Sequence, residues 1–402
     1  MSDSSQQNGS DALPDIGATI QLEITDLAFG GEGVGHHNGL AIFVPFVAVG
    51  EQIRTEITEV KKNYARGKLV ELIQSSPDRI EPRCPHFSAC GGCQYQHLSY
   101  PVQQKAKYKQ LVDIFQRIGG FPKPPIRPVV PCPTPYGYRN RILVRTQYSK
   151  ATKRMSIGFL RHDNRLVVDV EECYIAEPFL NQKLQKVRTD PPRKNGIKSN
   201  LRLMPEDWIL PPDSFFQVNY HLLPKMVTTV KQYLQSSGST HLLDVYCGAG
   251  FFCLKLASDV TSFTGIEIDK KAVQAARENA KTRHCDNGEF IALPAEVAIP
   301  KIISKFTATE TTVILDPPRK GCDSKLLDSL LQHQPQQLIY VSCHPATLCR
   351  DLAALCSEGK YLLRSVTPLD MFPQTKHIEC VCDLRCGDPQ PEKTVPTQQF
   401  SL

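Results

Sequence analysis

Apolar and polar residues follow one another with different periods along the 402-residue chain. From Ile16 to about Ile73, short runs alternate between apolar and polar positions, with glycine-rich turns between them, which predicts the strands of a small β-barrel. The stretch from Asp78 to Leu98 is loop-like, and a helix is predicted from about Tyr100 to Ile118. Alternation returns between Tyr138 and Val170 and predicts an antiparallel sheet.

One glycine-rich stretch inside the predicted barrel, GGEGVGHHNG, could be mistaken for a dinucleotide-binding loop. It contains Gly31, Gly33 and Gly35, but a strand pattern follows it where a dinucleotide site would need a helix. We therefore interpret this stretch as a hairpin turn.

Beyond about Phe215, predicted helices and strands alternate, which is typical of an α/β fold with a mainly parallel, Rossmann-like sheet covered on both faces. Two closing strands without a helix between them predict an antiparallel edge. The predicted order is helix 221–236, strand 241–246, helix 251–258, strand 263–269, helix 270–281, strand 289–293, strand 312–316, helix 324–333, strand 338–343, helix 345–356, and closing strands 362–370 and 378–386.

The composition is that of an ordinary globular protein, with 41% hydrophobic and 22% charged residues and a formal charge of +6. The longest apolar stretch, Ala41–Val49, is too short to span a membrane, and the polar start of the chain lacks a signal-peptide layout. We therefore expect a cytoplasmic protein without a membrane partner. Residues 1–15 and 388–402 are polar and are predicted to be disordered tails.

The sequence DVYCGAG, residues 244–250, lies at a predicted strand-to-helix turn whose glycines allow a ligand to approach the backbone. The next predicted strand contains Glu267, with Asp269 just beyond, and an acidic residue there can bind both hydroxyls of a ribose. This combination indicates an adenosine-type cofactor. GAGFF lacks the third spaced glycine of a pyrophosphate turn, which favours S-adenosylmethionine over a dinucleotide.

Three further residues lie where chemistry is expected at the sheet edge. Asp316 in LDPPRKG and Cys343 in VSCHP end neighbouring predicted strands, and Cys343 precedes a helix that favours its thiolate form. Glu379 lies among apolar residues near the start of the last strand and could act as a base. Cys322 and Cys349 are alternatives to Cys343 by residue type, but neither ends a predicted strand.

Fifteen cysteines in a chain without a secretion signal favour metal ligands, a catalytic thiol and buried thiols over disulfides. Cys84, Cys90 and Cys93 have the spacing C-x5-C-x2-C, and a fourth ligand would be Cys173 or, as second choice, Cys132. Four thiolates can hold an iron–sulfur cluster or zinc, and the spacing alone leaves both open.

Two groups of basic residues could bind phosphates. Arg139, Arg141 and Arg145 alternate along one predicted strand and so share one face of a sheet. The second group lies at one end of the predicted barrel and comprises Lys61, Lys62, Arg66 and Lys68.

Taken in order, these sequence features resemble the uracil-5 RNA methyltransferases, specifically those that act on 23S ribosomal RNA. The resemblance covers residues 16–385 and rests on C-x5-C-G-G-C, FFQVN, DVYCGAG, GIE, LDPPRKG, VSCHPATLCRD and the final HIE. It implies an RNA-binding, OB-like TRAM barrel over residues 16–75, a central domain with a [4Fe–4S] cluster over 76–212, and a methyltransferase domain over 213–387. It implies 23S ribosomal RNA as the partner, because transfer RNA members generally lack the barrel and the cluster, and no obligate protein partner is expected.

The resemblance also implies roles for single residues. Cys343 would add to C6 of uracil so that C5 becomes a nucleophile toward the methyl donor, and Glu379 would then remove the C5 proton. The implied cofactor contacts are Gln217, Tyr246, Glu267 and Asp316, and the implied cluster ligands are Cys84, Cys90, Cys93 and Cys173. The chain departs from the family at Phe251, Pro294 and His344, and Glu296 is a possible substitute contact.

Two other functions fit part of this pattern. One is methylation of the T-loop uracil of transfer RNA by the same chemistry. The other is a non-catalytic iron–sulfur protein that binds RNA, which the joint presence of Cys343, Asp316 and Glu379 disfavours.

Overall fold

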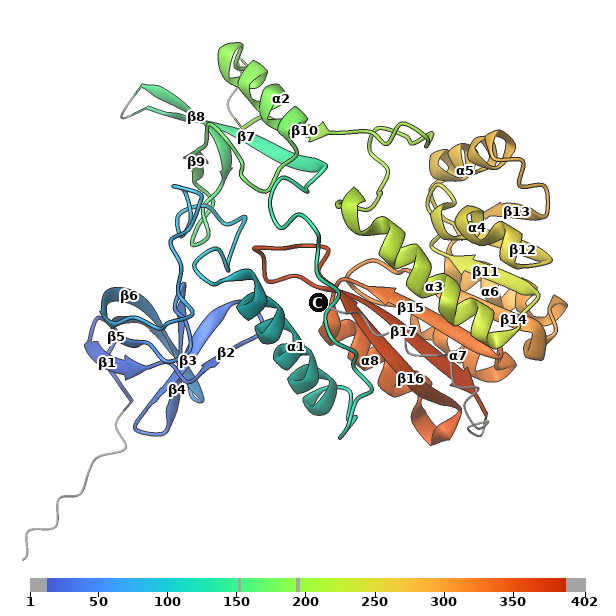
Figure 1. Ribbon diagram of the computed structural model, residues 1–402, viewed down its shortest axis with the longest axis horizontal. Helices are drawn as coiled ribbons and strands as arrows, with labels where there is room; N and C mark the ends of the chain where they lie inside the picture. The colour runs from blue at the N-terminus through green and yellow to red at the C-terminus, as the bar shows by residue number, and fades with distance from the viewer. Residues whose placement is uncertain (1–12, 151–152, 193–195, 388–402) are drawn as a thin grey trace, which may run out of the picture.

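The computed structural model describes residues 13–150, 153–192 and 196–387. Three sheets make up this part of the chain: a barrel of β1–β6, a four-stranded sheet of β7–β10, and a seven-stranded sheet of β11–β17. Helix α1 (Tyr100–Arg117) lies between the barrel and the seven-stranded sheet (Figure 1). None of the described helices is long and apolar enough to cross a membrane. Most of both predicted tails, residues 1–12 and 388–402, falls outside the described residues.

The predicted barrel strands are present, in the order β1-β5-β6-β4-β3-β2. Inward-facing apolar side chains alternate with exposed ones, as along β5, where Ile53 and Ile57 are fully buried. The strands are β1 (Thr19–Glu23), β2 (Asp26–Leu27), β3 (Glu32–His37), β4 (Leu40–Pro45), β5 (Gln52–Val60) and β6 (Tyr64–Gln74).

The interpretation of GGEGVGHHNG as one hairpin turn is wrong, because most of it forms β3, with turns on either side. A strand does follow it, as predicted, and not a helix. A Cβ atom at Gly33 would lie 2.3 Å from Val47 Cγ2, and one at Gly35 would lie 2.4 Å from the Glu23 carbonyl oxygen. The glycines therefore serve close packing inside the barrel, a use that composition alone does not distinguish from a turn.

The four-stranded sheet is antiparallel throughout, in the order β10-β7-β8-β9, as its alternation predicted. Helix α2 (Pro178–Thr189) packs Leu180 and Leu184 against Ile142, Val144 and Ile157. Neither α2 nor β10 was predicted. The strands are β7 (Arg141–Ser149), β8 (Arg154–Leu160), β9 (Val167–Asp169) and β10 (Lys198–Arg202).

The seven-stranded sheet has the order β13-β12-β11-β14-β15-β17-β16. Strands β11 to β15 are parallel, and β17 pairs antiparallel with both β15 and β16, which confirms the predicted antiparallel edge. The strands are β11 (His241–Val245), β12 (Ser262–Glu267), β13 (Gly288–Ala292), β14 (Thr311–Leu315), β15 (Gln337–Ser342), β16 (Tyr361–Leu369) and β17 (Glu379–Cys386).

Helices cover both faces of this sheet, and each strand sends alternate side chains to either side. On one face α3, α4 and α5 pack against residues such as Leu242 and Ile339, and on the other α6, α7 and α8 pack against residues such as Leu243 and Tyr340. Only α6 was not predicted. The helices are α3 (Leu223–Ser237), α4 (Phe251–Leu256), α5 (Lys270–Thr282), α6 (Ala295–Ile302), α7 (Ser324–His333) and α8 (Pro345–Leu355).

Helix α1 adds to the core of the seven-stranded sheet from outside its sequence range. Leu111, Ile114 and Phe115 of α1 belong to the same buried cluster as the sheet residues that face α8. The chain after α1 continues along the outer strand, where Ile126 and Val130 form bridges with β16. The N-terminal half of the chain therefore completes the core around the C-terminal sheet.

Candidate active site

The functional residues predicted in the C-terminal half lie along one edge of the seven-stranded sheet. Strands β11, β12, β14 and β15 run parallel, so their carboxyl ends meet at this edge. Tyr246, Asp316 and Cys343 each follow the last residue of a strand, and Glu267 is the last residue of β12. An open α/β sheet binds its ligands at this edge.

The glycine turn after β11 is held in shape by two buried or half-buried carboxylates. Asp244 accepts a hydrogen bond from the Cys253 amide at 2.9 Å, and burial raises the Asp244 pKa to about 6. Glu267 accepts hydrogen bonds from the Gly248 amide at 3.1 Å and the Asp269 amide at 2.8 Å. These two bonds fix the Glu267 carboxylate beside the turn, where further lone pairs of its oxygens can accept from a ligand.

An apolar surface borders this turn. Glu267 pairs with Ala292 across β12 and β13, so Ile268 and Leu293, which follow them, emerge next to each other. Ile268 is 64% exposed although it is apolar, and Leu293 is also exposed. Exposed apolar side chains beside a carboxylate that can bind ribose hydroxyls offer a surface on which an adenine ring can lie.

The departures from the family pattern have structural roles. Phe251 is buried in an aromatic cluster with Trp208, Phe216 and Phe252. Pro294 precedes the first turn of α6, where its fixed φ suits a helix start, and Glu296 lies in that first turn. His344 is the N-cap of α8 and accepts from the Thr347 amide.

Cys343, Asp316 and Glu379 meet at the centre of the edge. Ser342 pairs with Cys380 across β15 and β17, which places Cys343 beside Glu379. Glu379 is only 3% exposed, and burial together with nearby Asp316 raises the Glu379 pKa well above its usual value. Burial raises the pKa of Asp316 to about 7, and Gln217 donates to its Oδ2 atom at 3.4 Å. The structure thus brings together four residues that the sequence placed in one site.

Arg319 is a neighbour of this group that the sequence reasoning missed. Burial and the carboxylates raise the pKa of Cys343 to about 11, and a hydrogen bond and the positive charge of Arg319 oppose this increase. Arg319 also donates from Nη2 to His377 Nδ1 at 3.0 Å. In the sequence, Arg319 directly follows the double proline of LDPPRKG. The only signal was its residue type, since a cation beside a thiol favours the thiolate.

Phe215 was also missed. It lies two residues before Gln217 and is 64% exposed, which is unusual for so large an apolar side chain. An exposed aromatic ring next to a reactive site is a platform on which a base can stack. The doubled aromatic in FFQVN was the signal, since Phe216 is buried in the aromatic cluster and Phe215 points outward.

The predicted metal ligands Cys84, Cys90, Cys93 and Cys173 line one cavity of about 190 Å³, together with apolar side chains and Arg139. Within the described ranges, no three His, Cys, Asp or Glu side chains lie close enough to hold a single metal ion. The cluster therefore stays a prediction. Cys132, the second choice for the fourth ligand, instead donates to the Thr134 carbonyl and accepts from Asn219 Nδ2.

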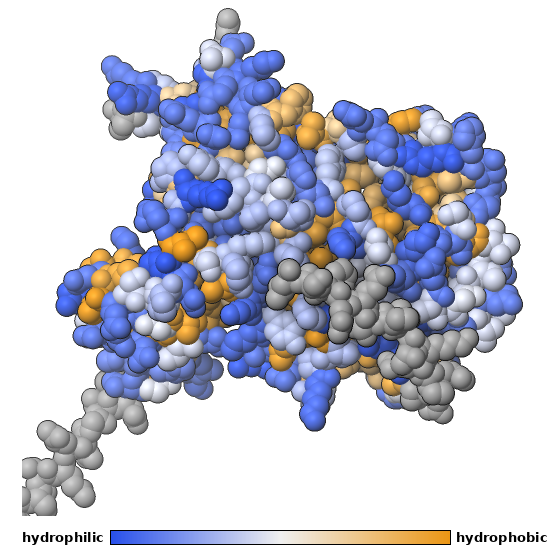
Figure 2. Space-filling view, in the orientation of Figure 1, coloured by the Kyte–Doolittle hydropathy of each residue, from blue (hydrophilic) through white to orange (hydrophobic). Residues whose placement is uncertain are grey.

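The two predicted basic groups differ in whether their charges form ion pairs with carboxylates. In the barrel, Lys61 pairs with Glu59, and Arg66 pairs with Glu32 and Glu59. In the four-stranded sheet, Arg145 lies opposite Lys198, and in the part of the chain that the structure describes neither forms an ion pair. Figure 2 shows largely hydrophilic side chains over this sheet and α2, at the top of the view. Like charges opposite each other are unfavourable unless an anion binds between them.

Comparisons with known proteins agree with this arrangement. Residues 197–385 match the tRNA (Uracil-5-)-methyltransferase family, and residues 15–70 match the TRAM domain. An uncharacterized RNA methyltransferase of Thermosynechococcus vestitus is 32% identical over 91% of this chain and 97% of its own length, and one of Nostoc is 31% identical over 90% and 95%.

A solved structure has the same architecture over nearly its whole length. The Pyrococcus abyssi tRNA (uracil-54, C5)-methyltransferase in complex with S-adenosyl-L-homocysteine superposes with a TM-score of 0.70, with 26% sequence identity, and the match covers 90% of this chain and 99% of that one. The chain therefore belongs to the S-adenosylmethionine-dependent RNA uracil-5 methyltransferase family and carries a TRAM domain in its N-terminal barrel.

Proposed function

We propose that this enzyme methylates C5 of a uridine in 23S ribosomal RNA through a transient bond between Cys343 and C6 of the base. The single observation that carries the proposal is the meeting of Cys343, Asp316 and Glu379 at the sheet edge beside the glycine turn. When bound, S-adenosylmethionine supplies an electrophilic methyl group on a sulfonium. Glu267, the glycine turn and the apolar surface of Ile268 and Leu293 suit its adenosine part.

The residues divide the reaction among them. The Cys343 thiolate forms a bond to C6, and the electron pair of the C5–C6 double bond moves onto O4 as an enolate. The enolate carbon C5 forms a bond to the methyl group, and the electron pair of the broken methyl–sulfur bond stays on the donor. Glu379 takes the C5 proton, and the C6–sulfur bond breaks to restore the double bond and the thiolate.

Each side chain suits its step. Arg319 is the cation beside the sulfur and favours the thiolate. Glu379 is buried, and the raised pKa of its carboxylate makes it a stronger base than an exposed one. Asp316 is held by Gln217 and can accept the N3–H of uracil, whereas N3 of cytosine has no hydrogen to donate. Phe215 provides a stacking surface for a base that has left its helix.

We also propose that Cys84, Cys90, Cys93 and Cys173 hold a [4Fe–4S] cluster. The cavity that all four thiols line supports this, because four thiolates around one space can bind the irons of such a cluster. The cluster spectrum and iron content of anaerobically purified protein test the proposal. Cys173→Ser should lose iron and Cys132→Ser should keep it, and one bound zinc in a colourless sample would overturn it.

The preference for ribosomal RNA rests on the sequence resemblance alone. The barrel does not separate the two substrates, because the match to the Pyrococcus abyssi transfer RNA enzyme covers 90% of this chain and so extends into the barrel. Transfer RNA is the second candidate, because the similar Pyrococcus abyssi protein is a tRNA (uracil-54, C5)-methyltransferase. Unmodified 23S ribosomal RNA and transfer RNA transcripts, each incubated with a labelled methyl donor and then mapped, separate the two. Methyl transfer only to transfer RNA would overturn the ribosomal assignment, and no transfer to any cellular RNA would overturn both.

A further inference from the structure

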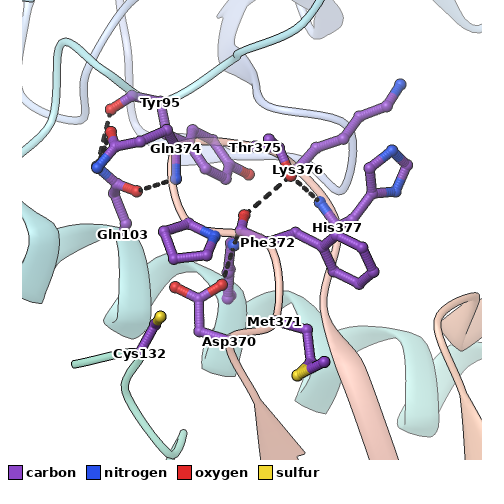
Figure 3. Close-up of polar contacts among 12 residues, drawn as sticks. Tyr95, Gln103, Cys132, Asp370, Met371, Phe372, Gln374, Thr375, Lys376 and His377 are labelled. Atoms are coloured by element: carbon purple, nitrogen blue, oxygen red, sulfur yellow. Dashed lines mark hydrogen bonds and ion pairs between the residues drawn. The ribbon is translucent and has the colours of Figure 1, made fainter. Parts of the chain in front are cut away.

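Most of the segment between β16 and β17, residues 370–378, is buried although it has no regular secondary structure. We call it the clamp segment. Asp370, Gln374 and Thr375 are polar and yet almost fully buried within it. The side chains of Asp370 and Gln374 bond to helix α1, whereas Thr375 bonds to the Phe372 carbonyl inside the segment. Figure 3 shows these contacts, which the reaction described above does not use.

Helix α1 holds one side of the clamp segment. Lys107 is fully buried and donates from Nζ to Asp370 Oδ1 at 2.6 Å and to the Phe372 carbonyl at 3.0 Å. Gln103 and Gln374 form two hydrogen bonds with each other. Gln103 Nε2 donates to Gln374 Oε1 at 2.9 Å, and the backbone N–H of Gln374 donates to Gln103 Oε1 at 3.0 Å. Buried bonds of this kind are costly to break because their partners are left without water.

The cysteine-rich loop holds the other side. The amides of Gln94 and Tyr95 both donate to the Gln374 carbonyl, at 2.9 and 3.0 Å. The Lys376 amide donates to Gln94 Oε1 at 3.1 Å. Gln94 directly follows Cys93, so one peptide bond separates the cysteine cavity from these contacts.

The far end of the clamp segment reaches the active site. His377 accepts from Arg319 Nη2 at 3.0 Å, and its ring lies 5.8 Å from that of Phe372 in an edge-to-face arrangement. Glu379, the first residue of β17, comes two residues later. The position of the clamp segment therefore sets where Arg319 and Glu379 stand relative to Cys343.

We propose that Gln103 and Gln374 are positioning residues, which hold the clamp segment so that His377 keeps Arg319 on the Cys343 sulfur. The proposal rests on the proposed role of Cys343 as nucleophile. It also gives the cysteine-rich loop a function in the reaction, because that loop fixes the same segment through Gln94 and Tyr95.

The expected effect follows from the groups that face Cys343. Asp316 and Glu379 disfavour the thiolate, Arg319 favours it, and the neighbouring Cys380 is a buried neutral thiol. His377 is held neutral, since burial and nearby cations lower its pKa to about 3, so it acts only as the acceptor that orients Arg319. If Arg319 moves away, the carboxylates remain and Cys343 becomes harder to ionise.

The test compares Gln103→Ala with Gln110→Ala. Gln110 is a buried glutamine on the same helix, but its side chain binds the barrel at Leu27 and Ala28 and the Tyr95 hydroxyl, not the clamp segment. The rate at which iodoacetamide modifies Cys343 is followed against pH by mass spectrometry of the peptide that contains it. Amide hydrogen exchange of Gln374 and Lys376 is measured on the same proteins.

In Gln103→Ala we expect the pH profile of Cys343 modification to move upward, with a rate at pH 8 lowered roughly 3- to 10-fold, and faster exchange at Gln374. Gln110→Ala should change neither. Gln94→Ala changes a half-buried side chain and should speed hydrogen exchange of the Lys376 amide, whose acceptor is lost. This milder variant replaces Gln103→Ala in the test if Gln103→Ala does not fold. Unchanged profiles and exchange, or equal effects in Gln110→Ala, would overturn the proposal. Neither readout needs RNA, so failure of the nucleophile assignment would show separately, as methyl transfer that survives the loss of Cys343.

Discussion

Cys343 and Glu379 lie side by side at the edge of the seven-stranded sheet, because the pairing between β15 and β17 ends at Ser342 and Cys380. The antiparallel insertion of β17 next to β15 is what creates this neighbourhood. A thiol and a buried carboxyl group that act on adjacent carbons of one ring need this closeness.

Replacement of Cys343 by Ala should lower methyl transfer by roughly 1,000-fold or more, since Cys343 forms the bond to C6 in the proposed mechanism. Binding of S-adenosylmethionine, measured by calorimetry, should stay within about threefold of the wild-type value, because the glycine turn and Glu267 are untouched. Cys285→Ser, at a half-buried thiol distant in sequence from the sheet edge, is the matched control and should keep full activity. Activity that survives in Cys343→Ala would show that another group attacks the base.

Glu379→Gln should allow the bond between Cys343 and RNA to form but block removal of the C5 proton. A protein band shifted by bound RNA should then accumulate on denaturing gels after incubation with RNA and the methyl donor. The double variant Cys343→Ala, Glu379→Gln should give no shifted band. A Glu379→Gln enzyme that turns over normally would contradict the assignment of the base.

Asp316→Asn should change how stability depends on pH. The pKa of Asp316 is raised to about 7 in the folded protein, so its stabilising contribution is complete below the unfolded value near 4 and is lost as the pH rises through 7. The unfolding free energy of the variant, relative to wild type, should therefore rise by on the order of 2 kcal/mol between pH 4 and pH 8. Urea unfolding at both pH values measures it, with the exposed Asp328→Asn as a control that should show no such change.

Removal of the opposed charges Arg145 and Lys198, each by mutation to Gln, should weaken RNA binding at every sequence tested. The slope of log affinity against log salt concentration should fall by about 1 for each charge removed. Lys305→Gln removes an exposed lysine from the 3₁₀ turn after α6 and should leave the slope unchanged. If the Arg145→Gln and Lys198→Gln variants have the same slope as the Lys305→Gln control, the result would argue against phosphate contact at this sheet.

Removal of the proposed iron–sulfur cluster should loosen the clamp segment before it unfolds the protein. Chelation of iron under anaerobic conditions should speed hydrogen exchange of the Gln374 and Lys376 amides, whose acceptors are Gln103 and Gln94. Buried amides of the barrel core, such as that of Ile57, are the internal reference and should not change. Exchange that is faster everywhere would indicate general unfolding instead.

The site could be predicted from the sequence where strand ends determine it. Parallel strands finish at one edge, so Asp316 and Cys343 had to be neighbours once their strands were recognised. Arg319 and Phe215 could not be placed in this way, because loop side chains depend on contacts that no local pattern records. The predicted domain boundary at residue 213 remains a prediction, and Leu111 of α1 shows that the core crosses it.

Helices and strands with a strong hydrophobic periodicity could be predicted from the sequence. Elements that contain glycine or proline, residues typical of turns and helix ends, were missed. Gly33 and Gly35 lie inside β3, although glycine is typical of turns. Helix α6 contains Pro300, which hides its helical pattern because proline usually ends a helix. The bonds between Gln103 and Gln374 join residues 271 positions apart, a distance over which neither helix nor strand periodicity carries information.

That separation also bears on how the active enzyme comes into being. Contacts between distant parts of a chain form slowly, because closure of the large loop between them costs conformational entropy before the contacts can stabilise the fold. We therefore expect the contacts between α1 and the clamp segment to form after the more local contacts of the barrel and the sheets. A C-terminal fragment without α1 would lack the hydrogen bonds from Gln103 and Lys107 that hold the clamp segment. The catalytic domain of this chain therefore cannot be separated from α1 without the loss of contacts that position its active-site residues.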